Sequence, residues 1–169
     1  MTHRDEESAS EVRRDRPETE ASYGIPDDRD GLLSWEFVAS RMADERTYWL
    51  STTRPDGRPH ARPVWGVWLD DHFHCGGGER TRWVRNLRAN PAVTVHRESG
   101  EEVVVIEGTA ERIDDTADSE RVARIDAAYD GKYGIRHGTP FFAVRPDAVL
   151  AWSDYPDDAT RWTFRDSDG

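Results

Sequence analysis

The residues best suited to chemistry lie where a short strand passes through three glycines into a helix. Glycines 76–78 follow the expected strand 72–75, and Arg80, Thr81 and Arg82 open the helix beyond them. Glycine lets a ligand approach the backbone closely, and the first helical turn offers N–H groups and the positive end of the helix dipole. This combination predicts a phosphate site. Spacing alone leaves an alternative, a solvated basic helix start after a flexible loop.

Two strands joined by a tight turn must position this junction. Residues 48–53 are aromatic and β-branched, and residues 54–57, Arg-Pro-Asp-Gly, have the composition of a type I turn. Residues 58–69 alternate as one strand, which places His60 and Arg62 on the same face. His60 could line the phosphate site or be exposed.

The rest of the chain reads as short strands with a few helices, which favours a mainly β fold, a closed antiparallel barrel. The apolar run Val103–Ile106 implies burial on both faces, by the barrel interior and by another subunit. The expected elements are a helix from the N-cap Ser34 to about 45, a helix from 82 that Asn90-Pro91 ends, strands 91–97 and 101–113, a helix 116–129, a hairpin of strands 140–145 and 148–153 around Pro146-Asp147, and a strand 160–164.

Composition excludes several classes of function. The net charge of −11 makes nucleic acid and anionic membranes unsuitable partners. A single cysteine, Cys75, forms no intrachain disulfide and fits a reducing compartment. The sequence contains no apolar run long enough to span a membrane and no signal-peptide core, so we expect a cytoplasmic protein. Lys132 is the only lysine, and this bias toward arginine suits either a halophile or a GC-rich genome.

The length of 169 residues indicates one domain, with polar ends. Residues 1–30 are charged and nearly devoid of large apolar side chains, which predicts a disordered tail that could be deleted to about residue 28 without loss of folding. An arm laid across a partner subunit near 23–26 is the alternative. The domain is expected over 31–165, with a short tail at 166–169.

The order of these motifs resembles the pyridoxamine 5′-phosphate oxidase-like family of flavin-binding split barrels. The resemblance runs over residues 32–165. It is carried by the D-G-R-P turn, the R-P-V-W strand, the T-R-x-x-R-N-L helix and the N-P-x-V strand, then by VVVIEGTAERI at 103–113, Leu150-Ala151-Trp152 and residues 159–164. It implies a homodimer of split β-barrels with the cofactor, FMN or an 8-hydroxy-5-deazaflavin coenzyme, between two subunits. The ending T-R-W-x-F tilts toward the deazaflavin, while the family at large favours FMN.

The resemblance also implies which residues bind the cofactor. Its phosphate would lie among basic and hydroxyl groups, and its ring along the backbone of the second strand. A second subunit would contribute residues from the last strands. Carried over by position, the phosphate residues are Arg62, Thr81 and Arg82 with Arg80 nearby, and the ring residues are Val64, Trp65 and Gly66. Cys75 stands where members often have a small hydroxyl residue, and the residues from the other subunit are Trp152 and Arg161.

Trp83 departs from the family pattern, because many members have Lys directly after the helix arginine. Arg80 could replace the lost charge. The signature that recognises pyridoxal phosphate is absent, which argues against pyridoxamine oxidation. His72 and His74 with Cys75 lack a second cluster, so we expect no metal site.

Two function classes remain. One is an oxidoreductase that transfers hydride to or from a small organic substrate, with the flavin supplying the chemistry and no catalytic residue identifiable. The other is a non-catalytic flavin or haem carrier on the same barrel.

Overall fold

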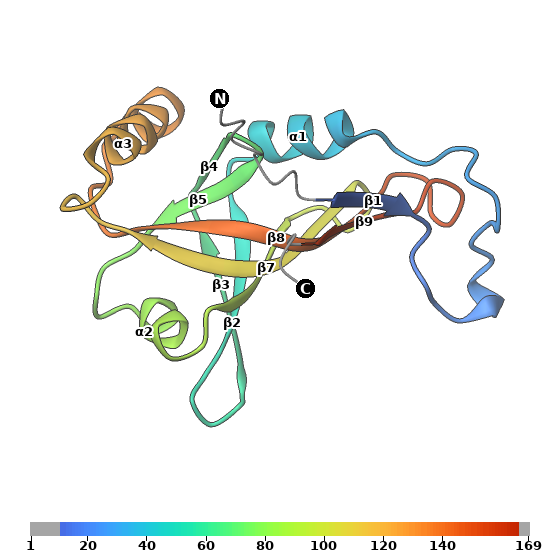
Figure 1. Cartoon of the computed structure of the whole chain (residues 1–169), viewed down its shortest axis with the longest axis horizontal. Helices are drawn as coiled ribbons and strands as arrows, with labels where there is room; N and C mark the ends of the chain where they lie inside the picture. The colour runs from blue at the N-terminus through green and yellow to red at the C-terminus, as the bar shows by residue number, and fades with distance from the viewer. Residues whose placement is uncertain (1–10, 166–169) are drawn as a thin grey trace, which may run out of the picture.

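The computed structural model describes residues 11–165, which form one antiparallel sheet of nine strands with three α-helices (Figure 1). Along the sheet the order is β1-β9-β8-β7-β6-β2-β3, and a hairpin of β4 and β5 joins through β5 to β8. The mainly β architecture is therefore confirmed. The strands are β1 (Glu11–Asp15), β2 (Tyr48–Thr53), β3 (Pro59–Val64), β4 (Val67–Leu69), β5 (His72–Gly76), β6 (Ala92–Arg97), β7 (Val103–Ile113), β8 (Phe141–Trp152) and β9 (Thr160–Arg165); the helices are α1 (Trp35–Asp44), α2 (Arg82–Ala89) and α3 (Ser119–Tyr133), with a 3₁₀ turn at Ala21–Tyr23.

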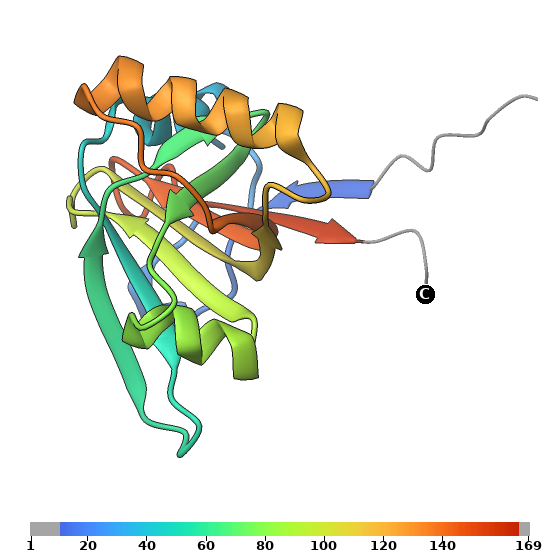
Figure 2. The ribbon, with the colours of Figure 1, turned by 90° about the vertical axis from the view of Figure 1, so that its left-hand side faces the viewer.

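The helices begin and end close to the expected residues. Ser34 and Thr81 occupy the N-cap positions of α1 and α2, and Asn90 is the C-cap of α2. The apolar stripe of α1 is buried through Val38 and Met42. In Figure 2, α3 and α2 lie on opposite sides of the strands, with the β2–β3 hairpin extending past α2. The α3 helix runs four residues beyond its expected end, to Tyr133.

Strand β8 corrects the expectation of a hairpin around Pro146-Asp147. It is one continuous strand, and β7 follows it along its whole length with a bulge after Glu107. Gly108 stands at the bulge, where a Cβ atom would collide with the carbonyl oxygen of Arg145. Glycine is therefore required for the close approach of the two backbones.

The expected strand 58–69 is broken into β3 and β4 at Trp65–Gly66. Side chains of α3 take over the backbone groups at the break. Tyr129 donates a hydrogen bond to the Trp65 carbonyl over 2.8 Å, and the Gly66 N–H donates to the Tyr133 hydroxyl over 3.0 Å. Glycine is needed at this break, because a Cβ atom on Gly66 would collide with the Phe73 ring.

The N-terminal segment corrects the expectation of disorder over 1–30 for the part that the structure describes, residues 11–30. Strand β1 pairs with β9 over its full length. The Arg16 guanidinium then ties two segments together. It donates to the carbonyl oxygens of Asp28, at 2.9 Å, and Asp30 in the N-terminal segment, and to those of Asp157, at 2.7 Å, and Ala159, at 3.1 Å, next to β9. The rest of the expected tails, 1–10 and 166–169, lies outside the described residues.

The core lies between the sheet and the helices. Tyr48, Leu50, Val95 and Ile106 are fully or almost fully buried in it. The run Val103–Ile106 is already mostly buried within one chain, with Val105 half-buried. Across residues 11–165 no helix is long and apolar enough to cross a membrane.

Candidate functional site

A cluster of positive charge forms where β3 approaches α2, as the phosphate expectation requires. We call Arg54, His60, Arg62 and Arg82 the basic cluster. His60 is buried, at 4% exposure, while Arg62 and Arg82 are exposed. Burial lowers the pKa of His60, and the positive charges of Arg62, Arg54 and Arg82 lower that pKa further. Arg54 joins the residues that the sequence predicts here, and a phosphate contact by Arg62 and Arg82 stays a prediction.

The start of α2 supplies unpaired donors beside this cluster. The Thr81 N–H bonds to the Gly78 carbonyl and the Arg85 N–H to the Thr81 carbonyl. Among the described residues, the N–H groups of the first helical turn, residues 82–84, have no acceptor. Thr81 is exposed and its side chain makes no cap hydrogen bond. These groups suit an anion.

The basic cluster contains a buried polar atom without a partner. His60 Nδ1 has no hydrogen-bond partner among the described residues. His60 pairs across the strands with Thr52, whose hydroxyl accepts a 3.0 Å hydrogen bond from the Asn86 amide of α2. A buried ring nitrogen without a partner, amid three arginines, fits an oxygen-rich anion.

The proposed ring position at Val64, Trp65 and Gly66 is only partly as expected. Gly66 is buried and its backbone faces α3: its carbonyl accepts from Lys132 Nζ over 2.9 Å and lies 2.8 Å from the Tyr133 hydroxyl. Its N–H is also taken, so Gly66 offers no donor to a ligand. Val64 is half-buried at the end of β3, and Trp65 is 42% exposed.

Trp65 presents a flat, rigid surface. Its ring stacks on Tyr133 with centroids 4.6 Å apart and planes at 1°, and the Arg46 guanidinium lies 5.5 Å from the Trp65 centroid. The sequence alone does not predict that Tyr133 and Lys132 of α3 support Trp65 and Gly66. One signal points to Lys132, because it is the single lysine in a chain rich in arginine.

Cys75 and Trp83 are core residues. Cys75 is 1% exposed, so it lies out of reach of a surface ligand, contrary to its expected part in cofactor binding. Its burial also raises the pKa of the thiol to about 12. Trp83 is 4% exposed and packs edge-on against Phe142, with centroids 5.4 Å apart. Arg80 is exposed next to Thr81.

Trp152 and Arg161 lie far from the basic cluster in the same chain. They share a face of β8 and β9, because Leu150 pairs with Arg161 and Trp152 follows two residues later. Four strands separate β9 from β3 in the sheet. One chain therefore does not assemble all the expected site residues. Arg161 Nε is buried without a partner among the described residues.

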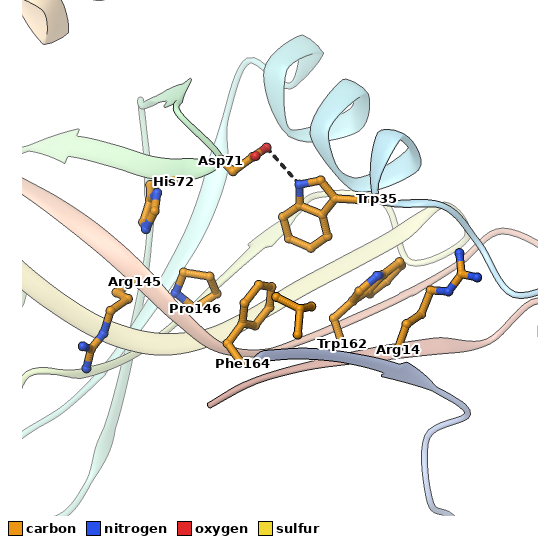
Figure 3. A pocket seen from close by; sticks show the side chains of 9 residues that line it. Arg14, Trp35, Asp71, His72, Arg145, Pro146, Trp162 and Phe164 are labelled. Carbon is orange, nitrogen blue, oxygen red and sulfur yellow. Dashed lines mark hydrogen bonds between the residues drawn. The ribbon is translucent and has the colours of Figure 1, made fainter. Parts of the chain in front are cut away.

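A cavity of about 510 Å³ lies at a third place, between the β1–β9 ribbon, α1 and the β4–β5 hairpin (Figure 3). Trp35, Trp162 and Phe164 form its aromatic wall. It contains none of the residues expected from the sequence to bind a cofactor. Within residues 11–165, no group of three or more His, Cys, Asp or Glu side chains is arranged for a metal ion.

The strand order, with β8 shared between the β4–β5 hairpin and β9, defines a split-barrel protein. A family model described as pyridoxamine 5′-phosphate oxidase matches residues 35–153. The chain therefore belongs to the pyridoxamine 5′-phosphate oxidase-like family, as the motifs indicated.

Solved structures of similar fold differ in what their names say they bind. A conserved hypothetical protein from Mycobacterium tuberculosis is 20% identical, with a TM-score of 0.62 over 74% of this chain and 88% of its own. An F420 reductase is 21% identical, with a TM-score of 0.51 over 65% and 94%. A heme binding protein from Mycobacterium smegmatis is 18% identical, with a TM-score of 0.60 over 80% and 59%. At these identities the likeness shows the fold alone. A comparison with curated proteins gives no match.

Proposed function

We propose that this chain is an oxidoreductase that binds a phosphorylated flavin, FMN or an 8-hydroxy-5-deazaflavin coenzyme, with the phosphate in the basic cluster. The observation that carries the proposal is the buried His60 Nδ1, which has no partner among the described residues and whose pKa the charges of Arg62, Arg54 and Arg82 lower. Guanidinium groups recognise phosphate through paired N–H donors, and the N–H groups of residues 82–84 would add further donors.

Among the residues expected at the ring, Trp65 is the exposed aromatic one, and it lies on the α3 side of the strands. Its indole is held by Tyr133 and Arg46, so it need not be ordered when a ligand stacks on it. The flavin supplies hydride chemistry when bound, and the protein supplies binding, orientation and exclusion of water. The substrate in this proposal is a small organic molecule.

Assembly from two copies is part of the same proposal. Trp152 and Arg161 lie at the opposite end of the sheet from the basic cluster, and Arg161 Nε is buried without a partner among the described residues. A second copy would bring this pair to the cofactor of the first. The family membership and the unpartnered Arg161 Nε support that arrangement.

The test is the substitution Arg82→Ala, titrated with FMN, the deazaflavin and riboflavin. Hydrogen bonds to charged groups contribute about 1.5–3 kcal/mol, so FMN affinity should fall about tenfold to a hundredfold. Riboflavin lacks the phosphate and should bind both proteins alike. Arg124→Ala is the matched control, because it removes the same charge from α3, where Arg124 pairs with Asp70. Equal losses for FMN and riboflavin would refute the phosphate assignment.

Haem carriage is the second candidate, since a heme binding protein is among the structures of similar fold. The absorbance of protein purified from its native host separates the candidates: a Soret band would indicate haem, and flavin and deazaflavin absorb at different wavelengths. Mass spectrometry of the released ligand then identifies it. A haem-loaded protein with no flavin would overturn the oxidoreductase proposal.

A further inference from the structure

The cavity in Figure 3 exists because β8 changes partners along its length. On one edge β8 pairs with β5 through Val144, and from Ala148 onward it pairs with β9. Residues 145–147 lie between these two pairings, so on this edge of β8 they pair with neither β5 nor β9. Pro146 has no N–H group, so its position in this gap leaves no backbone donor unsatisfied. We call the cavity over this gap the split pocket.

The wall of the split pocket is aromatic and rigid. Trp35 of α1 contacts Trp162 and Phe164 of β9, each with ring centroids 5.6 Å apart and planes near perpendicular. The Trp35 ring is fixed by a 2.9 Å hydrogen bond from its Nε1 to the Asp71 carboxylate. Trp162 is 3% exposed, so it forms the wall rather than the mouth. The volume of about 510 Å³ is in the range of small-molecule sites.

The remaining lining residues determine which ligand charge is favoured. Arg145 and Arg14 are exposed at opposite ends of the pocket, with His72 at the Arg145 end (Figure 3), and Asp71 is the only carboxylate among the described lining residues. Asp71 already accepts the Trp35 indole N–H. The described part of the lining is therefore net positive in a chain whose net charge is −11. An apolar aromatic wall with an arginine at each end matches a flat ring system with an anionic substituent.

We propose that the split pocket is a second ligand site, distinct from the basic cluster, which binds a planar aromatic anion. The ring system lies against Trp35, Trp162 and Phe164, and the anionic group lies toward Arg14. The site includes β1, so residues 11–15 are part of a functional element.

The probes are 8-anilino-1-naphthalenesulfonate and N-phenyl-1-naphthylamine, which share a ring system and differ by the sulfonate. Fluorescence titration of the full chain should give saturable binding of the sulfonate with one site per chain. Arg14→Gln should weaken it about twofold to fivefold, as for an exposed charge pair, and leave the neutral probe unchanged. Arg13→Gln is the matched control, because Arg13 lies on the opposite face of β1.

Filling the pocket tests its position without removing a core residue. Val12 lines the pocket and is 48% exposed, so Val12→Trp should fold and abolish saturable binding of both probes. Thr163→Trp places the same indole on the opposite face of the ribbon and should leave binding intact. Arg82→Ala should also leave it intact, which separates this proposal from that of the phosphate site.

Three results would overturn the proposal. The first is unchanged sulfonate binding in Val12→Trp. The second is equal affinity for the charged and neutral probes in the wild-type chain. The third is loss of binding as protein concentration rises, because it would mean that a second copy of the chain covers the pocket.

Discussion

Lys132 should make the stability of this protein depend on pH in a way that one substitution removes. Burial lowers the pKa of Lys132 to about 8 from its usual 10.5. Between these pH values the unfolded chain binds a proton that the folded chain does not, so stability rises with pH. Below pH 8 the cost of burying the charge is present in full, and above 10.5 it is absent.

The magnitude follows from the surroundings of the ammonium group. The difference between 10.5 and about 8 corresponds to about 3 kcal/mol. Hydrogen bonds to the Tyr48 hydroxyl, at 2.7 Å, and the Gly66 carbonyl, at 2.9 Å, favour the charged form. The Tyr48 ring, 4.8 Å away, does so too. We therefore expect about 1–2 kcal/mol of added stability from pH 7.5 to 9.5.

The assay is denaturant unfolding of the wild type, Lys132→Met and Lys132→Arg at fixed protein concentration across that range. Cys75 and Tyr48 have raised pKa values, so they lower stability as pH rises through the ordinary range of thiols and phenols. The contribution of Cys75 cancels in the difference between variants, and that of Tyr48, which contacts Lys132, begins only near pH 10, above the range of the assay. The difference in free energy of unfolding between Lys132→Met and wild type should shrink as the pH rises. Arginine stays charged over the whole range, so Lys132→Arg should gain no stability as the pH rises. A constant gap between wild type and Lys132→Met would refute the reasoning.

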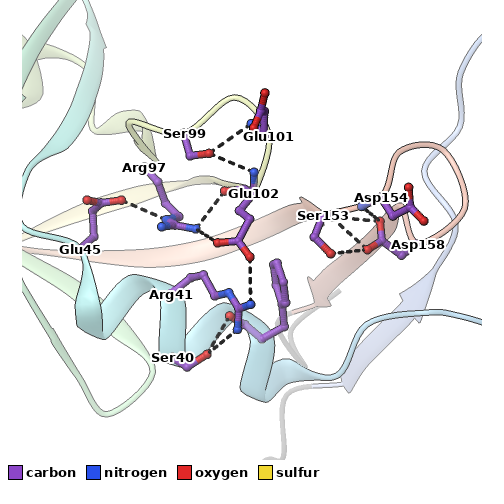
Figure 4. A network of polar contacts seen from close by, with 11 residues as sticks. Ser40, Arg41, Glu45, Arg97, Ser99, Glu101, Glu102, Ser153, Asp154 and Asp158 are labelled. Atoms are coloured by element: carbon purple, nitrogen blue, oxygen red, sulfur yellow. Dashed lines mark hydrogen bonds and ion pairs between the residues drawn. The ribbon is translucent and has the colours of Figure 1, made fainter.

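Three further predictions concern assembly and stability. Arg16→Ala should cost about 2–4 kcal/mol and make residues 17–30 sensitive to proteolysis, because four carbonyl groups lose one donor; unchanged proteolysis would contradict this. Arg97→Met should cost about 1–3 kcal/mol of stability, because the mostly buried Glu45 carboxylate, 3.0 Å away, would lose its partner. Arg97 also pairs with Glu102, which pairs with Arg41 in the same network (Figure 4). Arg58→Met at the hairpin turn removes an exposed ion pair and is the control. Light scattering in high salt should report twice the chain mass, and a monomer that still binds cofactor would refute the two-copy site.

Elements whose signals are local could be predicted from sequence. Ser34 and Asn90 mark helix ends through short-range stereochemistry, and they stand as caps in the structure. The family pattern predicts that Arg62 and Arg82 bind one phosphate, and the charges of both lower the pKa of His60. The sequence identifies Arg54 only as a turn residue, because a turn sequence carries no signal of a ligand.

Elements that depend on distant partners could not be predicted. Pro146-Asp147 has the composition of a turn, yet β8 continues through it as a bulge opposite Glu107 and Gly108 of β7. The polarity of residues 11–30 indicated disorder, yet Arg16 bonds to carbonyl groups 141 and 143 positions away. Gly66 was misplaced for the same reason, since the α3 side chains that break the strand there come from more than sixty positions later.

The sharing of β8 among three strands has a consequence for how the chain is made. Gly76 of β5 pairs with Phe141 of β8, so the edge of β5 waits for a segment synthesised 65 residues later. Strand β7 must wait for the same segment. During vectorial synthesis both edges stay open until β8 leaves the ribosome, and a chain stalled before Phe141 presents them to other chains. The risk of aggregation during synthesis therefore lasts until β8 is made, because β8 covers the open edges of both β5 and β7.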